Sequence, residues 1–443
     1  MVDQFAADEN LSGRNGLEVE AVLQDDASPN PVQNMVRRST WLLPVILISY
    51  FIVGFPDGAF TVSWLGISED MPGMTTAHTG WILVAYSVTY TLAGIVLSRL
   101  MRVLRLPTIY LFGLLTMAAG FLWLALAPNF GNVAAAIALY GLGTGAMAAS
   151  MNSYMASHFT ARHNNWMHFF WGAGAAVSPL IMGRMMISHS WRWGYFVIIG
   201  ILGLVALLLV ISIQQNIWIP DDAASNADED APGFHKRHYL EKPWHRWVLI
   251  ATFFFLGGTD YTLVFFTGAA LINRGFSPAS VVVLPAVYYG LMTLGRLVAG
   301  WLAQWLSELT IIRLAVAIAA LGMILLATTS GPTITGVYGG GYIAMAITGM
   351  AITGFGLGPL LPTLVSDTAN AFTPKILPKI VGYELAAFGA GIAVLFFLTS
   401  QLLHFVTYEL LFPLGLAFIG LVFLCNEVLD LAYRRLNETD THK

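Results

Sequence analysis

Two aspartates lie inside long apolar stretches, where an ionised side chain has a high free-energy cost. Asp57 is in GFPDGAF and Asp260 is in GGTDYT. Insertion scales place the cost of a carboxylate at the centre of a membrane helix at about 2.5–3.5 kcal/mol. Each aspartate follows a tryptophan, Trp41 or Trp244, by sixteen residues, which is about 24 Å of helix at 1.5 Å per residue. We therefore expect the two acids to lie at a similar depth and to face one cavity, where a carboxyl group can bind and release a proton.

Proton transfer at such a site could drive the movement of a solute. One elementary charge moved through 100 mV is worth ~2.3 kcal/mol, or about 50-fold accumulation, because 1.4 kcal/mol is a factor of ten. Two structural alternatives stay open. Asp57 could cap a helix that is broken at Pro56, and Asp260 could hydrogen-bond Tyr261 or Thr262. Sodium is a further candidate for the coupling ion, since carboxylates and backbone carbonyls at a broken helix can hold it.

Three more polar residues lie within or near apolar stretches. His168, in NNWMHFFWGAG, and Glu384, in GYELAAFGAG, each precede a shared GAG sequence. They are expected either as a pair on opposite walls of the cavity or as polar groups at hydrated helix ends. Arg296 is expected in a gate, held by a helix end or by an acid such as Glu308.

Binding of a sugar requires hydroxyl or amide partners and an aromatic face for the C–H groups of the ring. The side chains in apolar stretches that could supply them are Trp64, Tyr86, Tyr90, Asn152, Asn164, Asn165, Tyr288 and Tyr289. No catalytic, cofactor or metal site is expected. The histidines lack metal-ligand spacing, and the glycine-rich stretches lack the lysine of a phosphate-binding loop.

The elements that must position these residues are membrane-spanning helices. The chain has 443 residues, of which 57% are hydrophobic and 10% are charged, whereas a soluble protein carries about 25% charged residues. The apolar blocks of roughly 20 residues can each cross a hydrocarbon core of about 30 Å as a helix. Backbone groups have no partners in lipid, so the blocks must be helical or shielded. The sequence therefore predicts an all-α membrane protein. Its scattered basic residues do not indicate nucleic-acid binding.

Twelve spans are expected, in two sets of six. Their ranges are 40–66, 80–100, 107–127, 131–156, 165–188, 193–214, 244–272, 278–304, 309–329, 337–366, 377–404 and 409–428. This gives a disordered tail at 1–38, an N-terminal half at 39–214, a central loop at 215–243, a C-terminal half at 244–428 and a tail at 429–443.

The lysines and arginines are segregated between the two sides of the membrane. With the N-terminus in the cytoplasm, eighteen of them lie on the cytoplasmic side and three, Arg184, Arg192 and Arg274, lie on the other. Cytoplasmic segments carry an excess of basic residues. We therefore expect a multi-pass protein of the cytoplasmic membrane with both termini in the cytoplasm.

The two halves also share sequence. GLGTGAMAASMNSYMASHFT, from Gly141, aligns without a gap on GFGLGPLLPTLVSDTANAFT, from Gly354, with seven identical positions. GAG at 172–174 recurs at 389–391. Helix packing alone also favours glycines, but the shared Phe-Thr ending and the absence of gaps favour a true repeat. The predicted fold is therefore two pseudo-symmetric six-helix halves.

This layout resembles the major facilitator superfamily, whose solute site lies near the membrane midplane between two halves. GFPDGAFTVSW, NNWMHFFWGAGAAVSPL and SHSWRWGY resemble the L-fucose permease branch of sugar transporters, and GIVLSRLMRVLR and GRLVAGWLAQWL resemble the superfamily's signature loop. The resemblance implies proton coupling through an aspartate in the first span, which falls on Asp57, and a glutamate in the fourth. Here Ala146 or Met147 stands in place of that glutamate, so Asp260 or Glu384 is the expected second acid.

The leading hypothesis is a proton-coupled symporter that moves a sugar or a similar polar solute by alternating access, as a monomer. The main alternative is a proton-driven exporter of drugs or amphiphiles on the same fold. A third, a solute sensor, is disfavoured because the sequence contains no appended signalling domain. Hydroxyl partners and a stacked aromatic in the cavity would favour a sugar, and an apolar lining would favour export.

Overall fold

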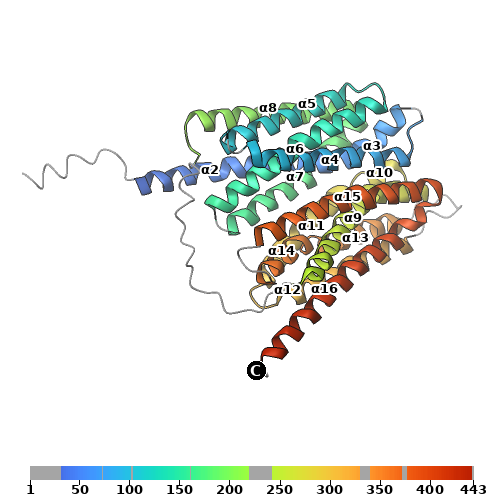
Figure 1. Ribbon diagram of the computed structural model, residues 1–443. Helices are drawn as coiled ribbons and strands as arrows, with labels where there is room; N and C mark the ends of the chain where they lie inside the picture. Colours follow the sequence, from blue (N-terminus) through green and yellow to red (C-terminus); the bar gives the residue numbers. More distant parts are fainter. Residues whose placement is uncertain are drawn as a thin grey trace, which may run out of the picture.

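The structure is a computed structural model and describes residues 31–71, 73–100, 103–159, 161–218, 242–329, 340–371 and 377–441. These residues form helices and no strand (Figure 1). The predicted tail at 1–38 and the central loop at 215–243 fall largely outside them. The N-terminal half contains α2 (Pro31–Val53), α3 (Phe55–Asp70), α4 (Thr76–Leu100), α5 (Leu106–Ala125), α6 (Phe130–His158), α7 (Ala161–Ser188) and α8 (Trp191–Gln214).

The C-terminal half repeats this arrangement. It contains α9 (Pro243–Asn273), α10 (Pro278–Val281), α11 (Leu284–Leu302), α12 (Glu308–Thr328), α13 (Gly340–Leu357), α14 (Leu360–Ala371), α15 (Leu377–Phe405), the 3-10 turn η2 (Tyr408–Leu410) and α16 (Leu411–Thr441). α16 continues beyond the predicted end of its span at residue 428.

Eleven membrane-crossing stretches, some of them broken helices, are long and apolar enough in the part of the chain that the structure describes. The expected twelfth span, 80–100, corresponds to α4, which has 25 residues and whose sequence at 79–96 is apolar and free of charged residues. This helix carries several threonines and tyrosines, and it lies between α6 and α15.

The first span is broken at Gly54, between α2 and α3. A β-carbon at Gly54 would lie 2.0 Å from the carbonyl oxygen of Trp171, and one at Gly174 would lie 1.7 Å from that of Phe51. Only glycine allows the backbones of the first span and α7 to approach so closely. Pro56 falls in the first turn of α3, where its missing N–H costs no helical hydrogen bond.

The two halves are related at the level of individual backbone contacts. Glycines at corresponding positions meet the carbonyl oxygens of corresponding residues. Gly54 meets the carbonyl of Trp171, and its counterpart Gly257 meets that of Phe388. Likewise, Gly174 meets Phe51 as Gly391 meets Phe254, and Gly145 meets Tyr90 as Gly358 meets Met292. The predicted repeat is therefore confirmed, and it includes the first and seventh spans, which carry Asp57 and Asp260.

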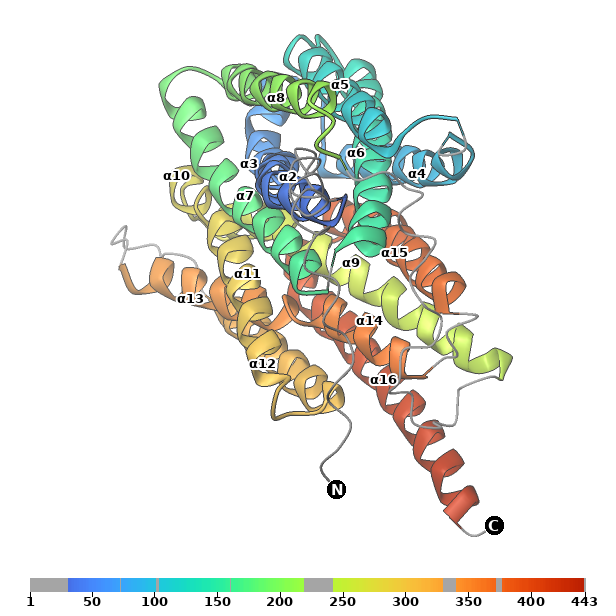
Figure 2. The same cartoon turned by 90° about the vertical axis from the view of Figure 1, so that its left-hand side faces the viewer.

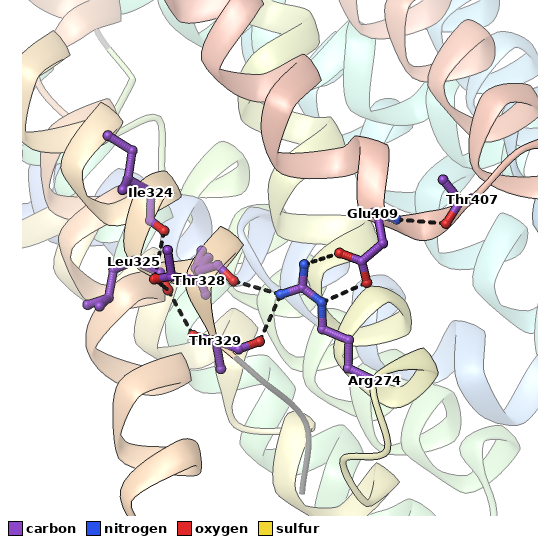
Figure 3. A network of polar contacts seen from close by, with 8 residues as sticks. Arg274, Ile324, Leu325, Thr328, Thr329, Thr407 and Glu409 are labelled. Carbon is purple, nitrogen blue, oxygen red and sulfur yellow. Dashed lines mark hydrogen bonds and ion pairs between the residues drawn. The ribbon is translucent and has the colours of Figure 1, made fainter. Parts of the chain in front are cut away.

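Each half is closed by an arginine clamp on the side away from the termini. In the N-terminal half, Arg192 donates to Asp70 over 2.7 Å and to the carbonyl of Ala127 over 3.1 Å. In the C-terminal half, Arg274 donates to Glu409 over 3.0 Å and to the carbonyl of Thr329 over 3.0 Å (Figure 3). The positions of the acid and the arginine are exchanged between the two clamps. The first span ends with the acid Asp70, whereas the seventh span ends at the C-cap arginine Arg274.

The halves converge on the side away from the termini, here called the far side, and diverge toward the side that carries both termini (Figure 1). On the far side Gln401 donates to the carbonyl of Ala77 over 3.0 Å, and Trp81 packs on Phe397. α7 lies beside α11, and α4 beside α15 (Figure 2).

Candidate functional site

Asp57 is held by two helices other than its own. The Tyr140 hydroxyl on α6 donates to Oδ1 over 3.3 Å, and the Trp171 indole on α7 donates to Oδ2 over 3.2 Å. α3 starts with Gly54 at its N-cap and without a side-chain capping bond. Asp57 lies in the first turn, where the helix dipole favours a negative charge. The break in the helix and the contacts across the half thus act on the same carboxylate.

Asp260 is buried at the corresponding position of α9 and accepts a hydrogen bond from the Tyr288 hydroxyl on α11. Tyr288 is fully buried and Tyr289 nearly so. Tyr288 was expected as a solute contact; in this structure its hydroxyl is occupied by Asp260. The neighbouring Thr262 hydroxyl has no hydrogen-bond partner among the described residues, and the acid finds its partner on another helix.

A continuous chain of contacts joins the two aspartates across the interface between the halves. Trp171, which binds Asp57, packs edge-on against Tyr289 with ring centroids 6.1 Å apart. Tyr289 in turn packs against Tyr288 at 5.4 Å, and Tyr288 binds Asp260. A change in the charge or solvation of one acid therefore acts on side chains that touch the other half.

Arg296 lies at the same interface. Its guanidinium stands 5.4 Å from the centre of the Trp171 ring, and its Nε donates to the carbonyl of Gly358 over 3.1 Å. The expected acid partner, Glu308, is not what holds it. Within the described ranges, no carboxylate lies within the 4.0 Å of an ion pair with this arginine.

His168 and Glu384 lie in different environments. His168 packs edge-on against Tyr50 of α2 with ring centroids 6.1 Å apart. Glu384 is 0% exposed and makes no well-formed hydrogen bond to a described residue, although the Thr368 hydroxyl and Asp367 of α14 lie near its carboxylate. No contact joins the two residues in this part of the chain. Burial of an ionised carboxylate without a partner is costly, so Glu384 is a second candidate for proton binding.

An aromatic plug closes the far side above Asp57. It consists of Phe60 and Trp64 from α3, Phe265 from α9 and Phe396 from α15, with ring centroids 5.2 to 6.1 Å apart. Trp64, expected as a solute contact, belongs to this plug. A cavity of about 30 Å³ lies beside it, lined by Thr61, Trp64 and Val282 among others. This is room for one or two water molecules, not for a sugar.

The remaining predicted contacts lie in the N-terminal half. Tyr86 stacks on Tyr140 at 5.1 Å and on Tyr90 at 5.8 Å, so both tyrosines adjoin the Asp57 site. Asn152 donates to the carbonyl of Ala148 over 2.8 Å and is thus partly satisfied by its own helix. Asn165 lies in α7, but its side chain is outside the described part of the structure.

Two residues that bind Asp57, Tyr140 and Trp171, were not anticipated. A signal for them is present in the sequence. Tyr140 directly precedes Gly141, the first shared glycine of the repeated stretch, and Trp171 directly precedes the repeated GAG at 172–174. Shared glycines mark the closest helix approaches, so the residues beside them lie at helix crossings.

Known proteins resemble this chain at low identity. It is 25% identical over 160 residues to MFS transporter L2 of Phoma sp. (strain ATCC 20986 / MF5453), covering 34% of this chain and 27% of that protein. It is 22% identical over 200 residues to Efflux pump hmp6 of Hypomyces subiculosus, covering 43% and 34%. The matched stretch spans about a third of the length of these relatives.

Two solved structures share the fold. A mutant of the nucleoside transporter NupG superposes with a TM-score of 0.68 at 11% identity, over 88% of this chain and 99% of that chain. FucP, a Major Facilitator Superfamily transporter solved in the outward conformation, superposes with a TM-score of 0.58 at 14% identity, over 87% and 98%.

The sequence profile of the Major Facilitator Superfamily matches residues 46–369, which is most of the chain and includes parts of both halves. This match establishes that the chain belongs to the Major Facilitator Superfamily of membrane transporters.

Proposed function

We propose that this transporter is a proton-coupled symporter that imports a small, hydroxyl-rich solute of the sugar class across the cytoplasmic membrane. The observation that carries the proposal is the contact of Asp57 with Trp171, which in turn touches Tyr289 of the other half. A proton that binds Asp57 changes the hydrogen-bond acceptor of Trp171, and Trp171 lies where the halves must separate or close.

The conformation fits one stage of alternating access. The halves touch on the far side and diverge toward the termini (Figure 1). If the termini are cytoplasmic, as the excess of basic residues on that side favours, this is the inward-facing stage. The solute and proton would then leave into the cytoplasm, and closure on that side would accompany opening of the aromatic plug.

Support for a sugar-like solute comes from the aromatic and hydroxyl groups around Asp57, namely Tyr86, Tyr90, Tyr140 and Trp171. NupG, which shares the fold, is a nucleoside transporter, and the ribose of a nucleoside carries hydroxyl groups. An efflux pump among the curated relatives supports the alternative of proton-driven export. For Asp57, Asp260 and Glu384 we propose proton-binding roles, with Asp57 as the main one.

The test is uptake of radiolabelled sugars by proteoliposomes with an imposed pH gradient, for wild type and Asp57→Asn. A tenfold proton gradient can support about tenfold accumulation at one proton per solute. Wild type is expected to accumulate the solute, and Asp57→Asn only to equilibrate it or exchange it. Glu69→Gln, an exposed acid on the same helix, is the matched control. Undiminished uphill uptake by Asp57→Asn would contradict the proposed coupling.

A further inference from the structure

Arg296 is an intramembrane cation with no ion-pair partner within 4.0 Å among the described residues, although Asp260, held by Tyr288, is near enough to act on its charge electrostatically. Its described partners are the Gly358 carbonyl at 3.1 Å, the Met292 sulfur at 3.8 Å and the Trp171 ring at 5.4 Å. A carbonyl and a thioether accept hydrogen bonds but carry no net charge, and the ring offers only its quadrupole. The guanidinium has five N–H donors in a planar fork, and these neutral partners leave several of them unused.

Other arginines in the structure are paired with acids although they lie at the surface or at the ends of spans. The ion pairs are Arg192–Asp70, Arg274–Glu409, Arg313–Glu427 and Arg434–Asp430. Arg296, in the middle of α11 and against the other half, is the one among these five for which a charge is most costly. An arginine in such a place normally pairs with an acid or marks a substrate pathway.

The position of Arg296 joins it to the coupling site. Its guanidinium lies over the same Trp171 ring whose indole N–H holds Asp57. The arginine belongs to α11 of the C-terminal half and the tryptophan to α7 of the N-terminal half, so their contact joins the two halves. A ligand that reaches Arg296 therefore contacts both halves.

We propose that the solute carries a carboxylate and that Arg296 is its binding residue, so that the transported class is the sugar acids rather than neutral sugars. The inference rests on the proposed symport function. A guanidinium binds a carboxylate through two parallel hydrogen bonds, and the free donors of Arg296 supply this fork. The hydroxyls of the solute would meet the tyrosines around Asp57.

This assignment also explains how proton and solute are coupled. While Asp260, which also acts on Arg296, keeps its proton, an ionised Asp57 and Arg296 carry opposite charges on either side of Trp171 in the empty transporter. With proton and carboxylate both bound, each charge is neutralised. With only one bound, a single charge remains in the membrane, which is the unfavourable case. The transporter can therefore change between its inward-facing and outward-facing conformations when both sites are empty or both are filled. With only one site filled, this conformational change is unfavourable.

The test uses matched pairs of compounds that differ in one oxidised carbon: galactose with galacturonate and glucose with glucuronate, together with gluconate and lactate. Uptake driven by a pH gradient is measured in proteoliposomes for wild type, Arg296→Gln, Arg296→Lys and the exposed-arginine control Arg184→Gln. Thermal stabilisation of each purified protein by the same compounds reports binding without transport and shows that each variant is folded.

The expected result is that a carboxylate exceeds its neutral parent in uptake and in stabilisation. Arg296→Gln should lose about 10- to 150-fold in apparent affinity for it, the range for a hydrogen bond to a charged group. Arg296→Lys should retain part of the affinity for the carboxylate, since lysine keeps the positive charge but lacks the paired N–H donors of the guanidinium. Arg184→Gln should have the same affinity as wild type. Uptake should respond to the pH gradient and not to an inside-negative potential, because one proton and one carboxylate carry no net charge.

Two results would overturn the inference and separate it from the proposed function. Uptake of the neutral sugar with equal or greater efficiency, unchanged in Arg296→Gln, would leave symport intact and exclude Arg296 as a solute site. Uptake that rises with an inside-negative potential would show that net positive charge enters with the solute, and would exclude neutralisation of the proton's charge by the solute carboxylate. If no compound is bound or accumulated by wild type, the proposed symport of sugar-class solutes fails, and the inference with it.

Discussion

Gly80 is a position where the contact between the halves is sensitive to side-chain size. It lies on α4 at the far side, and a β-carbon there would be 2.2 Å from the Ser400 hydroxyl and 3.1 Å from the Cα of Phe397 on α15. The hydroxyl can rotate, but the backbone of α15 can give way only if the two helices part. In Gly80→Leu three further carbon atoms must enter a site that is already buried.

We expect Gly80→Leu to destabilise the far-side-closed conformation by about 1–3 kcal/mol, the usual cost of overpacking. The conformation open on that side, in which α4 and α15 separate, is spared this cost. The ratio of the two conformations should therefore shift by roughly 5- to 150-fold toward the open one.

The shift can be measured by labelling a cysteine behind the plug. Thr61 lines the small far-side cavity, and Thr61→Cys in a Cys425→Ser background gives one thiol. Its rate of reaction with a membrane-impermeant maleimide, added outside intact cells, should rise in proportion to the open population. Gly200→Leu is the matched control, since a β-carbon at Gly200 meets no atom within 4 Å. Equal labelling rates for Gly80→Leu and Gly200→Leu would refute the assignment of this contact as the closure.

Three further predictions concern helix packing, the arginine clamps and the Asp57 site. Gly174→Ala places a β-carbon 1.7 Å from a backbone carbonyl, so its melting temperature in detergent should fall by several degrees (about 1–3 kcal/mol), whereas Gly203→Ala, in open space, should not change it. Arg274→Glu with Glu409→Arg should regain only part of the stability that Arg274→Glu loses, because the new ion pair no longer reaches the α12 carbonyls; full recovery in a thermal shift assay would argue against those bonds. Trp171→Phe keeps the ring but removes the indole N–H, and proton-driven uptake at low solute concentration should fall about tenfold or more; unchanged uptake would dissociate this tryptophan from coupling.

The fold could be predicted from the sequence because membrane insertion leaves a distinct pattern. Apolar blocks of the right length and repeated glycines located the spans and the relation between the halves. The repeat follows from packing, since glycines such as Gly145 and Gly358 are required where two backbones touch.

The acids of the candidate site could be predicted, but not their partners. An aspartate in an apolar stretch is conspicuous in any sequence, and its depth follows from the helical rise. The partners Tyr140 and Trp171 are 83 and 114 residues away from Asp57. Which face of their helices points to Asp57 depends on helix rotation, and composition carries no information about that in a chain with 13% aromatic residues.

The exchange of acid and arginine between the two arginine clamps has a consequence for assembly of the chain in the membrane. The halves share nearly the same glycine-lined grooves, so by shape alone a helix of one half could dock in the groove of the other. Such a docking would place Asp70 beside Glu409, or Arg192 beside Arg274, and like charges in contact repel. The charges of the clamps thus disfavour docking of a helix in the wrong half during folding, although the two glycine-lined grooves have nearly the same shape.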